Sequence, residues 1–176
     1  VRNLEWFLKL AFELNSTLDR SESVSLISQF FKKNLVLDGF SLWLVSQNTK
    51  KLELATHYGL AVSQYLTPLL QGKARAQLKL SQDPDKYHYL EDIAAGQNSA
   101  LHGSLLFIPL CPEKGSMLGF LALFRQRTAA FSVTEVALLR ETGRFISLHL
   151  RKILLFLNTR ELAYVDSLTQ VFNRRY

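Results

Sequence analysis

Apolar residues recur at intervals of three and four over residues 2–15 and again over residues 19–37. This spacing collects the apolar side chains on one face of a helix, so each stretch predicts an amphipathic helix. Asp19 stands three residues before Glu22, which is typical of the first turn of a helix. We expect the second helix to end at Asp38-Gly39, because glycine tolerates the left-handed backbone found at many helix ends.

Shorter apolar runs predict two pairs of strands. Residues 40–45 and 52–58 are joined by a polar turn, and residues 104–110 and 117–124 are joined by a turn at 112–116. Their aromatic and aliphatic content is typical of strands. The second pair is apolar on successive residues, so we expect both faces of this part of the sheet to be covered.

The middle of the chain has a weaker pattern. Residues 61–80 show a helical periodicity interrupted by Pro68 and Gly72, and residues 81–103 are polar and irregular. A long irregular stretch in a small domain is often a binding loop or a lid. We expect this segment to cover the face of the sheet that the terminal helices leave free.

A long helix is predicted to follow residues 132–135, whose Ser-Val-Thr-Glu sequence fits a capping box. The helix runs for about thirty residues without proline and carries a heptad stripe of apolar residues. Phe145, Leu148 and Leu155 lie on a neighbouring face, so the helix needs two partners: its own domain and a second copy of the chain. We predict a homodimer through residues 4–14 and the heptad stripe. The predicted seam residues are Leu139, Gly143, Ile146, Leu150, Ile153 and Leu157.

These elements predict an α+β fold with a central antiparallel sheet, terminal helices packed on one face and a long C-terminal helix. Their order resembles a GAF domain, a small-molecule sensing module. The resemblance covers residues 1 to about 160 and includes Ser16-Thr17-Leu18-Asp19, the run 104–110 and Leu118-Gly119-Phe120-Leu121. It implies a sensor domain over residues 1–158, with most of the long helix included.

The last eleven residues resemble a second family. They are similar to the D-x-L-T-x-x-x-N-R-R opening of a GGDEF domain, the diguanylate cyclase module, although Gln170 replaces the usual glycine. Asp, Thr and Asn are also ordinary capping residues, so a simple helix end is the alternative. The matching residues are Asp166, Leu168, Thr169, Asn173, Arg174 and Arg175.

The second resemblance implies a linker and the start of a GGDEF domain over residues 159–176. It also implies that the catalytic and metal-binding residues lie further downstream. We therefore expect this chain to be a piece of a longer, bacterial cyclic di-GMP signalling protein. The chain alone is not expected to be an enzyme.

The charge does not point to nucleic acid. The formal net charge is +6, but the basic residues occur as isolated pairs such as Lys32-Lys33 and Lys50-Lys51. A nucleic-acid groove needs a stripe of cations with exposed aromatic residues among them. No apolar run approaches the length of a membrane span, and the chain is expected to be cytoplasmic, because it has a single cysteine.

Cysteine and histidine usage limits the cofactors. Cys111 is alone, which excludes an intrachain disulfide and a cysteine metal cluster, and the methionine sulfoxide reductases of the GAF fold use several cysteines. A covalent bilin would need a cysteine near the pocket, and Cys111 follows the wrong strand. The cyclic-nucleotide signature of some GAF domains is absent. The four histidines show no metal-binding spacing, so no metal or cofactor is expected.

An unknown small ligand remains, bound between the sheet and residues 61–103. An aromatic lining would suit a flat organic molecule. The candidate lining residues are Trp43, Tyr58, Tyr65, Tyr87, His88, Tyr89 and His102. The alternative is a module that binds no small ligand and serves for dimerisation or protein interaction.

Overall fold

The computed structural model describes residues 2–59, 82–93 and 102–164, and the structural statements that follow concern these residues. The elements in chain order are α1 (Arg2–Asn15), α2 (Arg20–Asn34), β1 (Gly39–Val45), β2 (Leu52–Gly59), β3 (His88–Leu90), β4 (Ser104–Leu110), β5 (Gly119–Arg125) and α5 (Val133–Tyr164). The helical pattern expected over residues 61–80 lies outside the described residues. No helix in the described part of the chain is long and apolar enough to cross a membrane.

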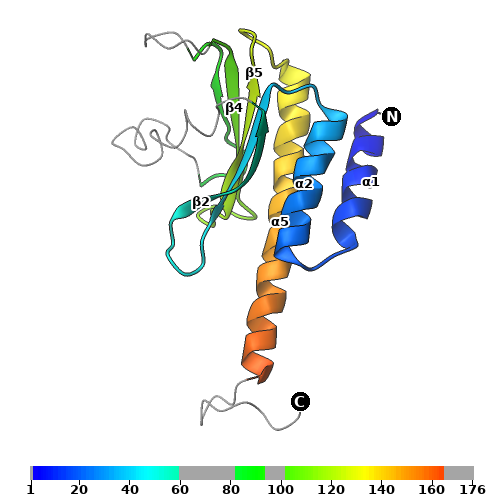
Figure 1. The fold of residues 1–176 in the computed structure, drawn as a ribbon, viewed down its shortest axis with the longest axis vertical. Coiled ribbons are helices and arrows are strands. Elements are labelled where there is room, and N and C mark those ends of the chain that lie inside the picture. The colour runs from blue at the N-terminus through cyan, green and yellow to red at the C-terminus, as the bar shows by residue number, and fades with distance from the viewer. Residues whose placement is uncertain (1, 60–81, 94–101, 165–176) are drawn as a thin grey trace.

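The strands form a five-stranded sheet in the order β2-β1-β5-β4-β3, and every neighbouring pair is antiparallel. The three helices lie on the same side of this sheet (Figure 1). α2 contacts β1 and β2, α5 contacts β4, and α1 packs on α2 and α5. The predicted α+β architecture, with terminal helices on one face and a long C-terminal helix, is confirmed.

Alternate residues of the central strands build two separate cores. In β1, Phe40, Leu42 and Leu44 belong to the core on the helix side, whereas Trp43 belongs to the core on the opposite side. All residues of β4 are buried, so both faces of the sheet are covered there, as the continuous apolar run predicts.

A β-bulge in β2 reverses the direction of the side chains along that strand. Trp43 of β1 pairs with Leu54, but its neighbour Leu42 pairs with Thr56, so Ala55 has no partner across the ladder. An extra residue of this kind shifts the two-residue alternation of a strand. Tyr58, which pairs with Phe40, therefore lies on the helix side of the sheet.

The N-terminus of α2 is as predicted, and its C-terminus is not. Asp19 is the N-cap, and its Oδ1 accepts a hydrogen bond from the backbone N–H of Glu22 at 2.8 Å. The helix ends at Asn34, because Leu35 has an extended backbone (φ −129°, ψ 139°). Leu35 and Leu37 pack against the helix-side core, and Gly39 begins β1 instead of ending the helix.

The capping box at the start of α5 forms in part. Ser132 Oγ accepts a hydrogen bond from the backbone N–H of Glu135 at 3.2 Å. The Glu135 carboxylate pairs with Arg125, whose Nη1 donates to it at 2.9 Å. Arg125 also donates to the carbonyl oxygens of Val36 and Ala130. One guanidinium group therefore ties the end of β5 to the start of α5 and to the segment before β1.

The predicted dimer seam on α5 is largely buried within the protomer. Leu139, Ile146, Leu150 and Ile153 belong to the helix-side core. A Cβ atom at Gly143 would come within 2.4 Å of Ile108 Cγ2 of β4, so this position faces the sheet. The assignment of these five residues to an intermolecular seam is wrong, because the heptad stripe packs on the sheet of its own domain. Leu157 lies beyond the core and is exposed.

Other apolar residues of the terminal helices are exposed. Leu148 and Leu155 of α5 are 50% and 57% exposed, and Leu8 and Phe12 of α1 are 60% and 83% exposed. We call these four residues the outer residues.

A buried polar contact joins α2 and α5. Ser23 Oγ and His149 Nε2 are 3.1 Å apart, and both residues are buried. Burial, followed by the charge of Lys152, lowers the pKa of His149. The imidazole is therefore held in its neutral form in the folded protein.

The lowered pKa of His149 predicts that the free energy of unfolding decreases in acid. An unfolded histidine titrates near pH 6.5, and the pKa of His149 is lower in the fold, so its contribution is complete above about pH 6.5. Below that pH the unfolded chain binds the extra proton, and up to about 1.4 kcal/mol is lost per pH unit until the folded pKa is reached. Urea unfolding at pH 7.5 and 5.5 measures this loss. The loss should be smaller in His149→Gln, and an equal loss in both proteins would contradict the assignment.

Candidate functional site

The face of the sheet opposite the helices carries a second buried cluster. It is built from alternate residues of β1, β4 and β5, together with one residue that follows β3. We call this cluster the aromatic face. Its buried members are Trp43, Ile93, Leu105, Phe107, Phe120, Ala122 and Phe124.

The rings of the aromatic face contact one another in a row across the strands. The rings of Trp43 and Phe120 are nearly parallel, with centroids 6.0 Å apart and an interplanar angle of 10°. Phe107 contacts Phe120 at 5.8 Å, and the His88 ring lies 6.0 Å from Phe107. The row therefore runs from β1 through β5 and β4 to the edge strand β3.

Polar groups lie at both ends of this row. At one end the indole N–H of Trp43 donates to Ser41 Oγ at 3.0 Å. At the other end is the half-buried imidazole of His88, on the short strand β3. Flat apolar rings bind other flat rings by stacking, and a few polar groups at the margin give orientation and specificity. The rings of Trp43, Phe107 and Phe120 are themselves buried, so a planar molecule would reach this row at its His88 end, where the imidazole is partly exposed.

The structure divides the predicted lining residues between the two sides of the sheet. Trp43 and His88 are on or beside the aromatic face. Tyr58 and Tyr89 both pack against the helix-side core, so their assignment to the lining is wrong. Tyr65 lies outside the described residues.

Tyr58 and Tyr89 face the helices because of strand register. Tyr58 follows the bulge in β2 and stacks on Phe40, with ring centroids 5.2 Å apart. Its hydroxyl is buried and bonds to no described residue, and burial raises the pKa of Tyr58 to about 12. Tyr89 pairs with Leu106 of β4, and its hydroxyl accepts from the backbone N–H of Phe131 at 3.3 Å.

The remaining two predicted residues are at the surface. Tyr87 is 46% exposed, and His102 is exposed just before β4. Neither belongs to the buried cluster of the aromatic face.

Sequence reasoning missed the phenylalanines that form the middle of the site. The sequence predicts that Phe107, Phe120 and Phe124 belong to continuous apolar strands, and it does not assign them to a face of the sheet. Their signal was present, because Phe120 and Phe124 are an even number of residues apart in one strand and therefore share a face. The pairing of β4 with β5 then places Phe107 beside Ala122 on that same face.

The described residues offer little for metal or thiol chemistry. No group of three or more His, Cys, Asp or Glu side chains among them could hold a metal ion. Cys111 is buried, and burial raises the pKa of its thiol to about 11. A thiol that stays protonated near neutral pH is a poor nucleophile. The residues that resemble the GGDEF opening lie outside the described residues.

Comparison with solved structures identifies the fold. The GAF domain of a phosphoenolpyruvate-protein phosphotransferase from Coxiella burnetii has a TM-score of 0.66 at 16% identity and covers 89% of this chain and 96% of its own. The corresponding domain from Acinetobacter has a TM-score of 0.64 at 16% identity, covering 90% of this chain and 98% of its own.

The structure of an enzyme is also similar to that of this chain. A free methionine-R-sulfoxide reductase from Neisseria meningitidis, solved in complex with its substrate, has a TM-score of 0.65 at 16% identity and covers 88% of this chain and 91% of its own. No protein-family model and no curated protein sequence matches the chain. Sheet order, helix placement and these similarities together show that the chain has the GAF fold.

Proposed function

We propose that this chain is the regulatory sensor domain of a larger signalling protein and that a small planar ligand binds over the aromatic face. The observation that carries the proposal is the row of rings from Trp43 to His88, on the side of the sheet away from the helices. Solved structures similar to this chain include a domain of a putative two-component sensor histidine kinase from Sinorhizobium meliloti. That use of the fold supports a sensory role.

The output of this sensor is the long helix α5. Its first part packs on β4, and its last part extends past the sheet and past α1 and α2 (Figure 1). We propose that α5 leads into the GGDEF module suggested by residues 166–176, and that two copies of the chain pair through the outer residues of α1 and α5. A ligand switches such a dimer if it binds two arrangements of the helices with unequal affinity.

Direct catalysis by this chain has less support. The similar reductases raise the possibility of thiol chemistry, but the chain has one cysteine, and Cys111 is buried with a raised pKa. A module that only dimerises is the second candidate, and the exposure of Leu8, Phe12, Leu148 and Leu155 favours it. The two candidates differ in whether a ligand binds.

A thermal-shift screen against nucleotides and aromatic metabolites tests the ligand. A compound present well above its dissociation constant should raise the melting temperature by at least about 2 °C. His88→Ala should remove this shift, because it deletes the polar ring at the end of the row. Tyr87→Ala is the matched control: the residue is adjacent in sequence but exposed, so the shift should remain.

Two outcomes would count against a ligand at the aromatic face. One is a screen in which no compound moves the melting temperature, which supports the dimerisation module. The other is a shift that His88→Ala leaves unchanged and Tyr87→Ala removes, which places the ligand elsewhere.

A further inference from the structure

The short strand β3 presents neighbouring residues to the two sides of the sheet. The ring of His88 lies 6.0 Å from that of Phe107, at the end of the aromatic face. The next residue, Tyr89, packs against the helix-side core. A movement of β3 that begins at His88 therefore also moves a side chain on the side where the helices lie.

Tyr89 holds the segment that leads into α5. Its hydroxyl accepts a hydrogen bond from the backbone N–H of Phe131 at 3.3 Å, and the two rings meet edge to face at 5.9 Å. The guanidinium carbon of Arg125 lies 4.6 Å from the centroid of the Phe131 ring. Arg125 Nη1 donates in turn to the carboxylate of Glu135, in the first turn of α5. These contacts form a continuous series from β3 to the start of the output helix.

The residue that follows β3 holds the same segment a second time. The carbonyl oxygen of Glu91 accepts a hydrogen bond from the backbone N–H of Ala129 at 3.1 Å. The hydroxyl of the buried Ser104 lies 3.0 Å from that carbonyl oxygen and 2.6 Å from that of Arg127. It also accepts from the backbone N–H of Ala130 at 3.0 Å. The connection between β5 and α5 therefore takes its position from β3 and from Glu91.

This connection contains a strained residue. Ala129 has a left-handed backbone, with φ +47°. Alanine rarely adopts this conformation, because its Cβ atom comes too close to the following carbonyl oxygen. Strain of this kind persists only where surrounding contacts hold it, and the bond to Glu91 is such a contact. If β3 moves, Ala129 has an unstrained conformation available, and a change of φ there redirects the start of α5.

We propose that β3 couples the aromatic face to α5: contact of a ligand with His88 shifts β3, and Tyr89 and Glu91 pass the shift through the connection at Ala129 to the first turn of the helix. The ligand in this scheme rests on the proposed sensor function, whereas the coupling between His88 and α5 can be measured without a ligand. The ligand acts if it has unequal affinity for the two positions of β3.

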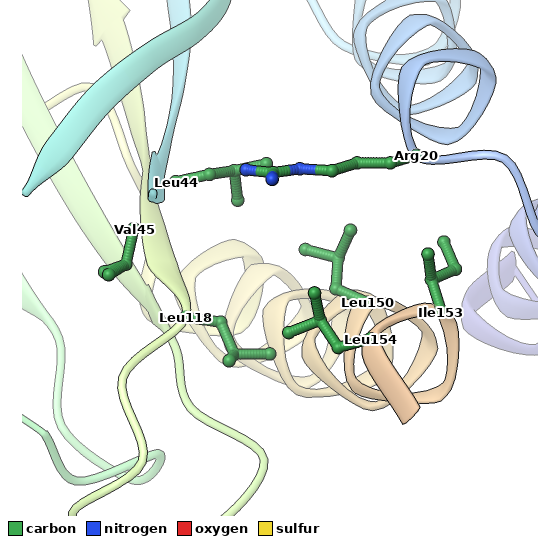
Figure 2. A pocket seen from close by; sticks show the side chains of 7 residues that line it. All are labelled: Arg20, Leu44, Val45, Leu118, Leu150, Ile153 and Leu154. Atoms are coloured by element: carbon green, nitrogen blue, oxygen red, sulfur yellow. The ribbon is translucent and has the colours of Figure 1, made fainter. Parts of the chain in front are cut away.

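The other end of the packed part of α5 offers no comparable entry for a ligand. A pocket there is lined by Arg20, Leu44, Leu118 and Leu154, beside Ile153, the last residue of α5 in the helix-side core (Figure 2). Its volume is about 30 Å³, which is enough for water and far below the range for ligand sites. Its occupants are therefore of the size of water.

Amide hydrogen exchange of the full chain, followed by NMR, tests the contact between β3 and the connection. Tyr89→Phe keeps the ring but removes the hydroxyl acceptor, so the Phe131 amide should exchange about three- to tenfold faster than in the wild type. Tyr87→Phe is the matched control. Tyr87 is two residues away and exposed, so its substitution should leave the exchange of Phe131 unchanged.

His88→Ala tests whether a change on the aromatic side of β3 reaches α5. It should speed exchange at Ala129 and Phe131 at least about threefold more than at Ile146. Ile146 lies in the middle of α5 and is fully buried, so its amide reports any loss of overall stability. In the Tyr89→Phe background, His88→Ala should have a smaller additional effect at Phe131.

Two results would overturn the coupling: equal acceleration at Phe131 and Ile146 in His88→Ala, or unchanged exchange of Phe131 in Tyr89→Phe. These results are separate from those of the thermal-shift screen. A ligand that raises the melting temperature, together with equal acceleration, would overturn the coupling and keep the ligand site. Faster exchange at Phe131 without any ligand from the screen would keep the coupling and count against the ligand.

Ala129→Gly tests the strain in the connection. Glycine adopts a left-handed backbone without strain, so this substitution should not lower the melting temperature. Ala137→Gly is the matched control: Ala137 is exposed within α5, and glycine there should lower the melting temperature by about 2–4 °C. An equal decrease in both variants would show that Ala129 is unstrained and would overturn the proposed switch at this residue.

Discussion

Ile146→Asp is expected to unfold the domain. Ile146 is fully buried in the helix-side core, where aspartate loses the apolar contacts and places a carboxyl group among aliphatic side chains. Removing a buried isoleucine costs about 2–5 kcal/mol, and burial of an unpaired polar group adds to that loss. The total is comparable to the stability of a whole domain, about 5–15 kcal/mol. Circular dichroism at 25 °C and urea unfolding measure the effect.

Leu148→Asp is the matched control for this prediction and also tests the proposed dimer. Leu148 is two residues away on the same helix but 50% exposed, so its substitution should change the free energy of unfolding by less than about 1 kcal/mol. If the outer residues form a dimer interface, Leu148→Asp should reduce the mass in light scattering to that of a single 20.1 kDa chain. A folded Ile146→Asp protein together with an unfolded Leu148→Asp protein would reverse our assignment of the faces of α5.

Phe120→Ala is expected to lower the free energy of unfolding by about 3–5 kcal/mol. Phe120 is fully buried in β5, and its ring contacts both Trp43 and Phe107. Alanine removes both ring contacts and leaves a cavity at the centre of the aromatic face. Urea unfolding measures the loss, and the fluorescence of Trp43 should change because its stacked neighbour is gone.

Phe156→Ala is the matched control for Phe120→Ala. Phe156 is 40% exposed near the end of α5, so the same deletion there should cost less than about 1 kcal/mol. A similarly small cost for Phe120→Ala would mean that water reaches its ring, and it would contradict the buried cluster we describe.

The order of elements could be predicted from sequence because each element has its own periodicity. Residues 2–15 and 104–110 were predicted with the bounds that the structure has, since long apolar faces and continuous apolar runs are strong local signals. The end of α2 was harder. Leu35 and Leu37 continue the apolar pattern, but they pack on the core from an extended segment, and periodicity does not distinguish the two.

The candidate site was less predictable because it depends on which face of a strand each residue occupies. Trp43 lies on the aromatic face, whereas Tyr58 lies on the helix side of the sheet. The bulge at Ala55 changes the alternation of β2, and the sequence 52–58 carries no glycine or proline that would mark it.

The heptad stripe on α5 shows a different limit of sequence reasoning. A stripe of apolar residues predicts that a helix face is covered, but it does not say by what. Leu150 and Ile153 fit a dimer seam and a sheet-facing surface equally well from sequence. Contacts with the helix-side core decide between them.

The unbroken course of α5 from Val133 to Tyr164 has a consequence for the angle between the sensor and whatever follows it. An α-helix turns by about 100° per residue. One added residue beyond Ile153 would therefore rotate everything downstream by about 100° around the helix axis, and seven added residues would nearly restore the original direction. If a domain follows α5, as we propose, the number of residues between Ile153 and that domain therefore fixes the direction in which the domain faces around the helix axis.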